Sequence, residues 1–222
     1  TPLFETHRRL GARLVPFAGW EMPIQYSSIL EEHAAVRERA GLFDVSHMGQ
    51  IFFEGPDALA AVDALVTSDV ASLAIGRARY GLLLNDAGGC VDDVIATRLG
   101  ERELFLCVNA SNIDKDREWI LRHVSGDVRV DDRSASTALL ALQGPASARI
   151  LARFAGAELE LPRRFGAARM KLAGLDLIVS ATGYTGSPGF EIACANDAAE
   201  RLFTGLLAAG EADGIKPVGL GA

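Results

Sequence analysis

The chain has 222 residues, of which 49% are hydrophobic and 23% charged, a composition typical of a globular protein long enough to bury a core. Its formal net charge of −7, without any long Lys or Arg run, argues against a nucleic-acid or anionic-membrane surface, because both need clustered positive charge. The three cysteines lie far apart and show no C-x-x-C spacing, which indicates neither a disulfide framework nor a zinc site and favours a reducing compartment. No apolar run reaches the ~18 residues that span a bilayer.

The first half of the chain alternates helix and strand signals. A helix is predicted over 27–43, where Ser27 or Ser28 can cap and the basic end precedes Gly41. "GQIFFEG" then reads as a strand and "GPDALAAVDALVTSDV" as a second helix. The stretch over 78–111 breaks into three strand-like runs at "NDAGG" and "GERE", which is typical of a β-meander.

The second half repeats part of this order. "NIDKDREWILRHV" predicts an amphipathic helix, and "DVRVDDRS" alternates as an edge strand would. "TALLALQGPASARILARF" again runs strand, Gly-Pro, helix, roughly ninety residues after the first copy, so we expect an α+β protein with two related halves. A hairpin-rich stretch over 170–194 and a helix over 197–210 follow.

Two adjacent acids, Asp92 and Asp93, lie inside one of these strand-like runs. Successive side chains of a strand point to opposite faces, so the two carboxylates cannot serve the same pocket. They could simply cap a hairpin or bind loop amides after Gly88 and Gly89. An acid on an apolar strand face is costly unless it is paired or used, which makes the pair a candidate for a functional carboxylate.

Glu191 poses a similar question at the end of "TGYTGSPGFEI". The glycines permit close backbone approach, and Glu191 lies between the apolar Phe190 and Ile192. The run could be a hairpin whose side chains bind no ligand. Alternatively, a buried Glu can accept two parallel hydrogen bonds from an N–H pair such as that of a pterin or purine ring.

Seven stretches, taken together and in order, resemble one family. They closely resemble the aminomethyltransferase (T-protein) of the glycine cleavage system, and the resemblance covers the whole chain. "FAGWEMP", "DVSHMG" and "TGYTGxxGFE" are the motifs most specific to that family and its near relatives. The seven are "TPLFETHRRLGARLVPFAGWEMPIQY", "RAGLFDVSHMGQ", "NDAGGCVDDVI", "VNASNIDKD", "ALQGP", "TGYTGSPGFE" and "PVGLGA".

The resemblance implies a fold of two related α+β, ferredoxin-like domains followed by a C-terminal β-barrel. The expected domains are residues 1–48 plus 138–222, a first folate-binding domain, and residues 49–137, a second domain that carries the GGxxDD strand. Because the chain stops at "GIKPVGLGA", we expect a form truncated before the barrel and inactive by itself.

The resemblance also implies the site. Asp93 would be the catalytic carboxylate, held in a largely apolar slot beside the N5 and N10 atoms of the folate. Glu191 would grip the pterin edge, and Tyr80, Met48 and Ile95 would line the folate slot. At Ser187 and Pro188 the chain departs from the acidic pair of the common "TGYTGEDGFE", in a turn where we expect altered rigidity and little effect on chemistry.

The implied reaction passes the methylene carbon of a lipoyl-bound aminomethyl group to tetrahydrofolate, giving 5,10-methylenetetrahydrofolate and ammonia. Tetrahydrofolate would be the co-substrate, no metal is expected, and the partner would be the lipoyl carrier protein (H-protein), with no nucleic acid or membrane. The location would be a bacterial cytoplasm or a mitochondrial matrix. Two folate-binding relatives stay open as alternatives: an iron–sulfur cluster assembly factor, whose family lacks the GGxxDD acids, and the folate domain of dimethylglycine- or sarcosine-oxidising enzymes.

Overall fold

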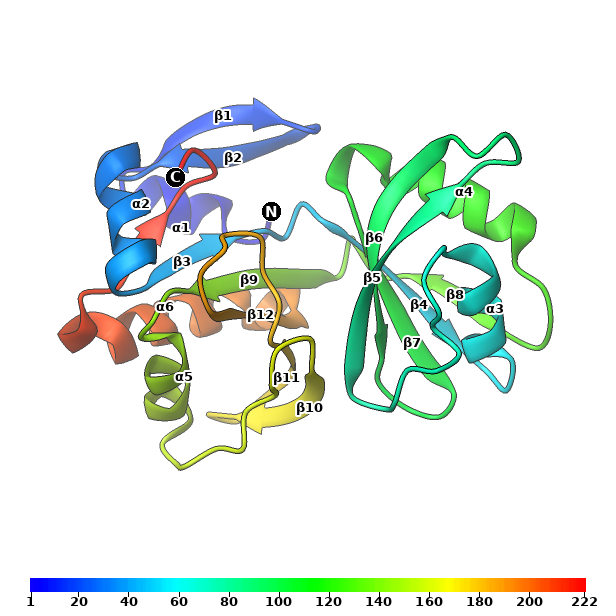
Figure 1. Cartoon of the computed structure of the whole chain (residues 1–222). Helices are drawn as coiled ribbons and strands as arrows, with labels where there is room; N and C mark the ends of the chain where they lie inside the picture. Colours follow the sequence, from blue (N-terminus) through cyan, green and yellow to red (C-terminus); the bar gives the residue numbers. More distant parts are fainter. The chain divides into compact units, whose positions relative to one another are not determined.

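The computed structural model describes residues 1–222, which pack as two compact units (Figure 1). Unit 1 comprises Thr1–His47, Thr137–Arg164 and Arg169–Ala222, and unit 2 comprises Met48–Ser136 and Phe165–Ala168. Each unit combines helices with a mainly antiparallel sheet, so the predicted α+β class is confirmed.

Unit 1 is built on a six-stranded sheet in the order β10-β11-β12-β9-β3-β13, beside the separate hairpin β1-β2. Its strands are β1 (Arg13–Phe17), β2 (Trp20–Gln25), β3 (Gly41–Asp44), β9 (Thr137–Gln143), β10 (Ala167–Leu172), β11 (Leu175–Ser180), β12 (Gly189–Ala195) and β13 (Lys216–Val218). Its helices are α1 (Phe4–Arg9), α2 (Ile29–Glu38), α5 (Ser147–Ala155) and α6 (Ala199–Gly210), with single 3-10 turns at Asn196–Ala198 and Glu211–Asp213.

The two faces of the unit 1 sheet pack against different helices. Leu140 and Leu142 of β9 and Ile192 of β12 join the residues of α5 and α6 in the main core. The intervening Ala141 points to the other face, where it packs with Phe43 and with Val36 of α2. This alternation is the period of two that a strand imposes, and it leaves β12 with an apolar core side and a second side that carries Glu191.

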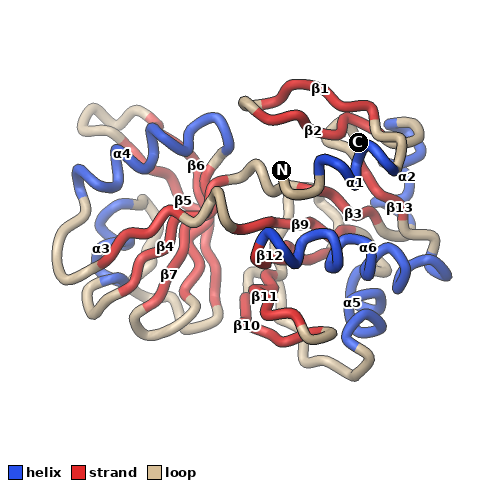
Figure 2. Tube along the Cα trace, turned by 180° about the vertical axis from the view of Figure 1, so that it is seen from behind, coloured by secondary structure: helices blue, strands red, loops and turns tan.

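Unit 2 has a five-stranded sheet in the order β5-β6-β7-β4-β8. Its strands are β4 (Gly49–Glu54), β5 (Arg77–Leu84), β6 (Cys90–Arg98), β7 (Glu103–Val108) and β8 (Arg129–Asp132), and its helices are α3 (Ala58–Leu65) and α4 (Ile113–His123), with a 3-10 turn at Ala110–Asn112. Both helices pack on one face of this sheet, as Figure 2 shows. The core there includes Val62 of α3, Ile120 of α4 and Val94 of β6.

The Gly-Pro pairs explain why the same strand-turn-helix order occurs in both units. Gly55 leaves β4 with a φ of +148° and Gly144 leaves β9 with a φ of +126°. A side chain at Gly55 would meet the backbone of Asp127, and one at Gly144 would meet the backbone of Arg39. Only glycine combines this backbone conformation with so close an approach, so the motif predicted from sequence has a steric cause.

The start of the chain contains elements that the sequence patterns did not predict. α1 has only six residues and no side-chain cap, and the β1-β2 hairpin turns through Ala18 and Gly19, both with positive φ. By contrast, the predicted helix over 27–43 is seen as α2 over Ile29–Glu38, where the Ser28 hydroxyl accepts the Glu31 backbone N–H. Its predicted end was wrong, because Arg39 leaves the helical conformation and the chain continues into β3 from Gly41.

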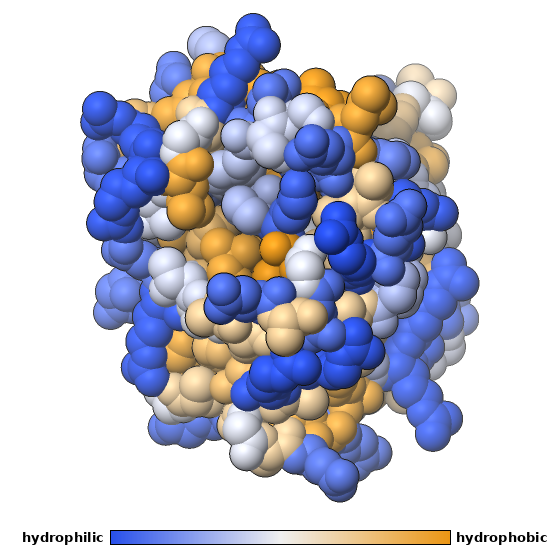
Figure 3. Space-filling model, turned by 90° about the vertical axis from the view of Figure 1, so that its left-hand side faces the viewer, coloured by the Kyte–Doolittle hydropathy of each residue, from blue (hydrophilic) through white to orange (hydrophobic).

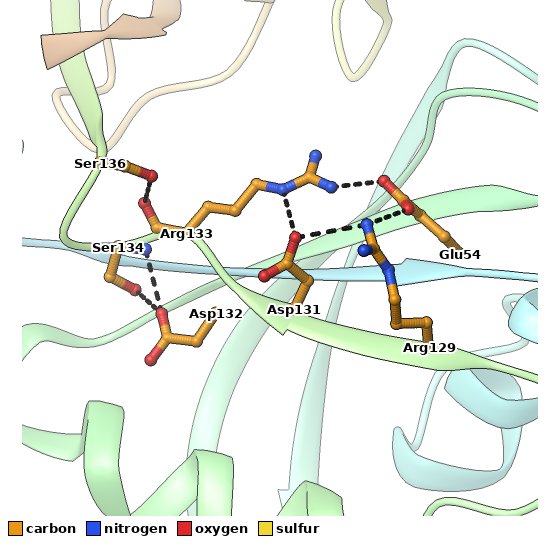
Figure 4. A network of polar contacts seen from close by, with 7 residues as sticks. All are labelled: Glu54, Arg129, Asp131, Asp132, Arg133, Ser134 and Ser136. Atoms are coloured by element: carbon orange, nitrogen blue, oxygen red, sulfur yellow. Dashed lines mark hydrogen bonds and ion pairs between the residues drawn. The ribbon is translucent and has the colours of Figure 1, made fainter.

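The outer strand β8 is tied to β4 by charged side chains (Figure 4). Arg133 donates to Glu54 at 2.5 Å and to Asp131 at 2.8 Å, and its guanidinium lies 4.2 Å from the ring centroid of Phe52. Arg129 donates to the second oxygen of Glu54 at 2.6 Å. The hydrogen bond from Arg133 is the main cause that lowers the pKa of Glu54, and the network links the edge strand β8 to β4.

The surface of unit 1 seen in Figure 3 mixes hydrophilic residues with scattered apolar ones. No helix of the chain is long and apolar enough to cross a membrane.

Candidate functional site

The unit 2 sheet presents several predicted site residues on the face away from α3 and α4. Ile95 of β6 lies directly opposite Tyr80 of β5, and Asp93 lies two residues before Ile95 on the same strand. Residues opposite one another or two apart share a sheet face, so these three side chains point the same way. Cys107 of β7 lies opposite Ile95, and Gln50 of β4 lies opposite Cys107. Met48 comes two residues before Gln50, immediately before β4 begins. The structure therefore brings Asp93, Ile95 and Tyr80 together.

Asp93 is an exposed carboxylate with a defined orientation. The side-chain amide of Asn109 donates to its Oδ1 at 3.0 Å and to its backbone carbonyl at 3.1 Å. The side chain leaves the sheet on the face that the helices do not cover, so the largely apolar slot expected around Asp93 stays a prediction. Tyr80 is also half exposed at 53%.

Asp92 is the buried member of the pair and lies on the opposite face. It accepts the backbone N–H of Asn109 at 3.0 Å, the side-chain amide of Asn109 at 3.0 Å and the amide of Asn112 at 2.5 Å. Burial would raise the pKa of Asp92, but hydrogen bonds from Asp116 and from these asparagines outweigh it and lower the pKa. The simpler of the two interpretations given above, an acid that binds loop amides, therefore fits Asp92.

Glu191 occupies the corresponding kind of position in unit 1. It lies on β12 opposite Ala141 of β9 and Ser180 of β11, on the face away from α5 and α6. Thr182 donates its hydroxyl to Oε2 of Glu191. Burial raises the pKa of Glu191, and the Thr182 hydrogen bond only partly opposes this. A partly desolvated carboxylate of this kind gains from any ligand that offers N–H donors.

The loop before Glu191 is held by Gln143 and Arg37. Gln143 donates to the carbonyl of Thr182 at 3.1 Å and accepts the hydroxyl of Thr185 at 2.8 Å. A side chain at Gly183 or Gly189 would collide with the Gln143 amide, which confirms the predicted close approach at these glycines.

Ser187 takes part in the same anchoring. Arg37 of α2 donates to the Thr185 carbonyl at 3.2 Å and to the Ser187 hydroxyl at 2.9 Å. At this departure from the family motif, the Ser187 hydroxyl is a neutral acceptor for the Arg37 guanidinium. Tyr184, in the middle of the loop, is fully exposed.

Sequence reasoning did not single out Asn109, Asp116, Thr182 or Tyr184. The signal available for Asn109 was its place at the end of a strand predicted to neighbour that of Asp93, and Tyr184 is an aromatic residue inside a glycine-rich run. Groups of three or more His, Cys, Asp or Glu side chains arranged to hold a metal ion are absent from the structure.

These features define an α+β protein of two units. Unit 1 presents Glu191 on the sheet face away from α5 and α6, and unit 2 presents Asp93 on the face away from α3 and α4. The chain belongs to the family described as the GCVT N-terminal domain, whose model matches residues 3–222. The resemblance found in the sequence is thereby confirmed.

Known relatives agree with this assignment. The chain is 50% identical over 223 residues to the aminomethyltransferase of Geobacillus kaustophilus strain HTA426, with 100% of this chain and 61% of that relative covered. It matches the crystal structure of the glycine cleavage system aminomethyltransferase T from Bartonella henselae with a TM-score of 0.90 at 38% identity, covering 100% of this chain and 60% of that one. The chain therefore spans about three fifths of the length of these relatives.

A more distant likeness concerns the fold alone. A chain of the heterotetrameric sarcosine oxidase from Corynebacterium sp. U-96 matches with a TM-score of 0.57 at 22% identity, over 86% of this chain and 94% of that chain.

Proposed function

We propose that this chain forms the folate-binding part of an aminomethyltransferase that passes a methylene carbon to tetrahydrofolate. The observation that carries the proposal is Asp93, an exposed carboxylate fixed by Asn109 on the same sheet face as Ile95 and Tyr80. The name shared by the Geobacillus and Bartonella relatives supports the same reaction. The donor would be the aminomethyl group on the lipoyl arm of a carrier protein of the glycine cleavage system.

Asp93 would act on the amines of tetrahydrofolate. The carbon forms new bonds to N5 and N10 while its bonds to the lipoyl sulfur and to the amino nitrogen break. The protons lost from the two folate nitrogens end on ammonia and on the released thiol. Each attacking nitrogen becomes cationic before it loses its proton, so a nearby anion stabilises the developing charge and can accept that proton.

The other residues would bind and orient the folate. Glu191 offers two acceptor oxygens to an N–H pair on the pterin edge, and its raised pKa reflects burial that such donors would offset. Tyr80, Ile95 and Met48 would supply apolar contacts to the ring. No metal is proposed.

Calorimetric titration of the chain with tetrahydrofolate tests the binding half of the proposal. We expect saturable 1:1 binding that Glu191→Gln weakens and Glu158→Gln, an exposed control in the same unit, leaves unchanged. A version extended to the full length of the relatives, supplied with an aminomethyl-loaded lipoyl carrier, should release ammonia and form 5,10-methylenetetrahydrofolate. Absence of both binding and turnover would reject the proposal.

The two alternatives are separated by the same assay. An iron–sulfur assembly factor would bind tetrahydrofolate without releasing ammonia, and the Asp92-Asp93 pair argues against it. The folate domain of a sarcosine- or dimethylglycine-oxidising enzyme would accept formaldehyde-level carbon without a lipoyl donor. The bacterial relatives lead us to expect the protein in a bacterial cytoplasm.

A further inference from the structure

Two carboxyl groups meet inside unit 2, behind the strand that carries Asp93. Asp116 of α4 is fully buried, and Asp92 of β6 is 4% exposed. Both oxygens of Asp116 lack a hydrogen-bond donor from the rest of the protein. Asp116 lies one helical turn after Asn112, whose amide donates to Asp92, and each of the two carboxyl groups shifts the pKa of the other. Two buried carboxylates this close cannot both be ionised without a large desolvation and repulsion cost, and one proton shared between them removes that cost.

We propose that Asp92 and Asp116 share one proton and act as positioning residues, which fix Asn109 and, through it, the carboxylate of Asp93. The inference rests on the proposed function of Asp93 and extends it to a buried pair for which that function gives no role.

The hydrogen bonds form a continuous chain from Asp92 to the candidate catalytic group. Asn109 donates its backbone N–H to Asp92 Oδ2 and its side-chain amide to Asp92 Oδ1, both at 3.0 Å. The same amide donates to Asp93 Oδ1 at 3.0 Å. Asn109 thus bridges the buried acid and the exposed one, and the direction of its amide is set by Asp92.

The direction of each hydrogen bond requires Asp92 to be the ionised partner. Asn109 and Asn112 present only N–H donors to it, so every one of these contacts needs an acceptor oxygen. The shared proton must then reside on Asp116, which donates it to Asp92. A protonated carboxyl is the one form of Asp116 that gives its buried oxygens a hydrogen bond.

The electrostatics agree with this assignment. Burial, together with the hydrogen bond and charge of Asp92, raises the pKa of Asp116 to about 8. Lys115 of the same helix is the charged group that opposes this shift, and its ammonium donates to the Val91 carbonyl at 2.5 Å. Above about pH 8 the proton is lost, and a second negative charge then faces Asp92 and disturbs the alignment of Asn109.

Three variants separate positioning from simple folding. Asp116→Asn keeps a donor toward Asp92 and removes the titration. Asp116→Leu removes the hydrogen-bond donor that faces Asp92. Asp114→Asn is the matched control, with the same substitution at an exposed site on the same helix.

The first readout is the side-chain amide signal of Asn109 in a ¹⁵N NMR pH titration of the chain. The signal should shift with a midpoint near pH 8 in the parent and in Asp114→Asn, and should be independent of pH in Asp116→Asn. A parent signal that does not titrate, or an Asp116→Asn variant that titrates like the parent, would overturn the proposal. This readout needs no folate, so it stands even if tetrahydrofolate binding and transfer fail.

The second readout is kinetic, in the version extended to full length. Asp116→Leu should lower kcat ~10- to 100-fold while KM for tetrahydrofolate stays within about twofold, because a misdirected Asp93 affects chemistry more than binding. Asp116→Asn should restore kcat and should keep it above pH 8, where the parent declines. Equal loss in both Asp116 variants, or a loss confined to KM, would contradict a positioning role.

Discussion

Each unit contains buried acidic side chains, and the two units stabilise the buried carboxylates Asp44 and Asp92 in different ways. In unit 1, Asp44 contacts the buried His7 ring at 2.8 Å and accepts the Ser46 backbone N–H at 2.9 Å. In unit 2, Asp92 lies among amide donors and a second acid, Asp116. Burial opposes ionisation of both, yet hydrogen bonds lower the pKa of Asp44 and of Asp92. One unit thus uses an imidazole where the other uses a neutral carboxyl group.

The outward-facing acids differ as well. Asp93 is solvated and oriented by an amide, whereas Glu191 is partly desolvated and bound by one hydroxyl. A solvated, oriented anion suits proton transfer, and a desolvated one suits recognition of N–H donors. We therefore expect substitutions in the two units to affect different quantities: turnover for Asp93 and affinity for Glu191.

The largest effect should follow from Asp93→Asn in the full-length version. The amide cannot accept a proton or offset developing positive charge, so turnover should fall ~10²- to 10⁴-fold while tetrahydrofolate binding is mostly retained. Steady-state kinetics and calorimetry measure the two quantities. Asp176→Asn, whose side chain is 88% exposed, is the charge-matched control. Turnover within a few-fold of the parent would exclude a catalytic role for Asp93.

The next effect concerns stability and the imidazole of unit 1. His7→Leu leaves Asp44 buried without its partner and should lower the free energy of unfolding by about 3–5 kcal/mol, measured by urea denaturation. His33→Leu, at an exposed position of α2, serves as the control. Because the folded-state pKa of Asp44 lies below its ordinary value, the stabilisation is present above about pH 4 and lost as the pH falls. A His7→Leu protein as stable as the control would show that the hydrogen bonds alone suffice for Asp44.

Much of this comparison was accessible from sequence because it depends on local geometry. Strand alternation predicts that Asp92 and Asp93 face opposite ways, and the Gly-Pro turns predict the shared strand-helix order. Which of the two acids is buried could not be predicted from the sequence. It depends on which sheet face α3 and α4 cover, and nothing within "CVDDVIATR" distinguishes the faces, since apolar residues occur on both.

The partners of these acids were hidden for a similar reason. Asp116 follows Asp92 by more than twenty residues and reaches it only because α4 packs back on β6. His7 meets Asp44 across a comparable separation, from a helix too short to leave a periodic signal. Long-range packing creates these contacts, whereas a single sequence reveals only local periodicity and turn chemistry.

A smaller effect is expected at Glu191. Glu191→Gln presents one acceptor oxygen where the pterin edge offers two donors, so tetrahydrofolate affinity should fall ~10-fold while the turnover of bound folate changes less. The two variants should therefore differ in kind: Glu191→Gln alters KM and the dissociation constant, whereas Asp93→Asn alters kcat. A Glu191→Gln protein with parental affinity in calorimetry would remove Glu191 from the proposed folate site.

The smallest effect concerns how the two buried pairs respond to pH, where we expect opposite signs. Asp116 keeps its proton in the folded protein up to about pH 8 but loses it near pH 4 when unfolded, so its contribution to stability is fully present at acidic pH and declines as the pH rises toward 8. Between about pH 6 and pH 7, the free energy of unfolding of the parent should fall by about 1.4 kcal/mol more than that of Asp116→Asn, which lacks this titration. Urea denaturation of the parent, Asp116→Asn and Asp114→Asn at several pH values measures the difference, and the Asp114 variant should follow the parent. Parallel pH profiles for the parent and Asp116→Asn would mean that Asp116 ionises as readily in the folded protein as in the unfolded chain. Unit 2 would then contain no neutral carboxyl group, and the contrast between the two units would be lost.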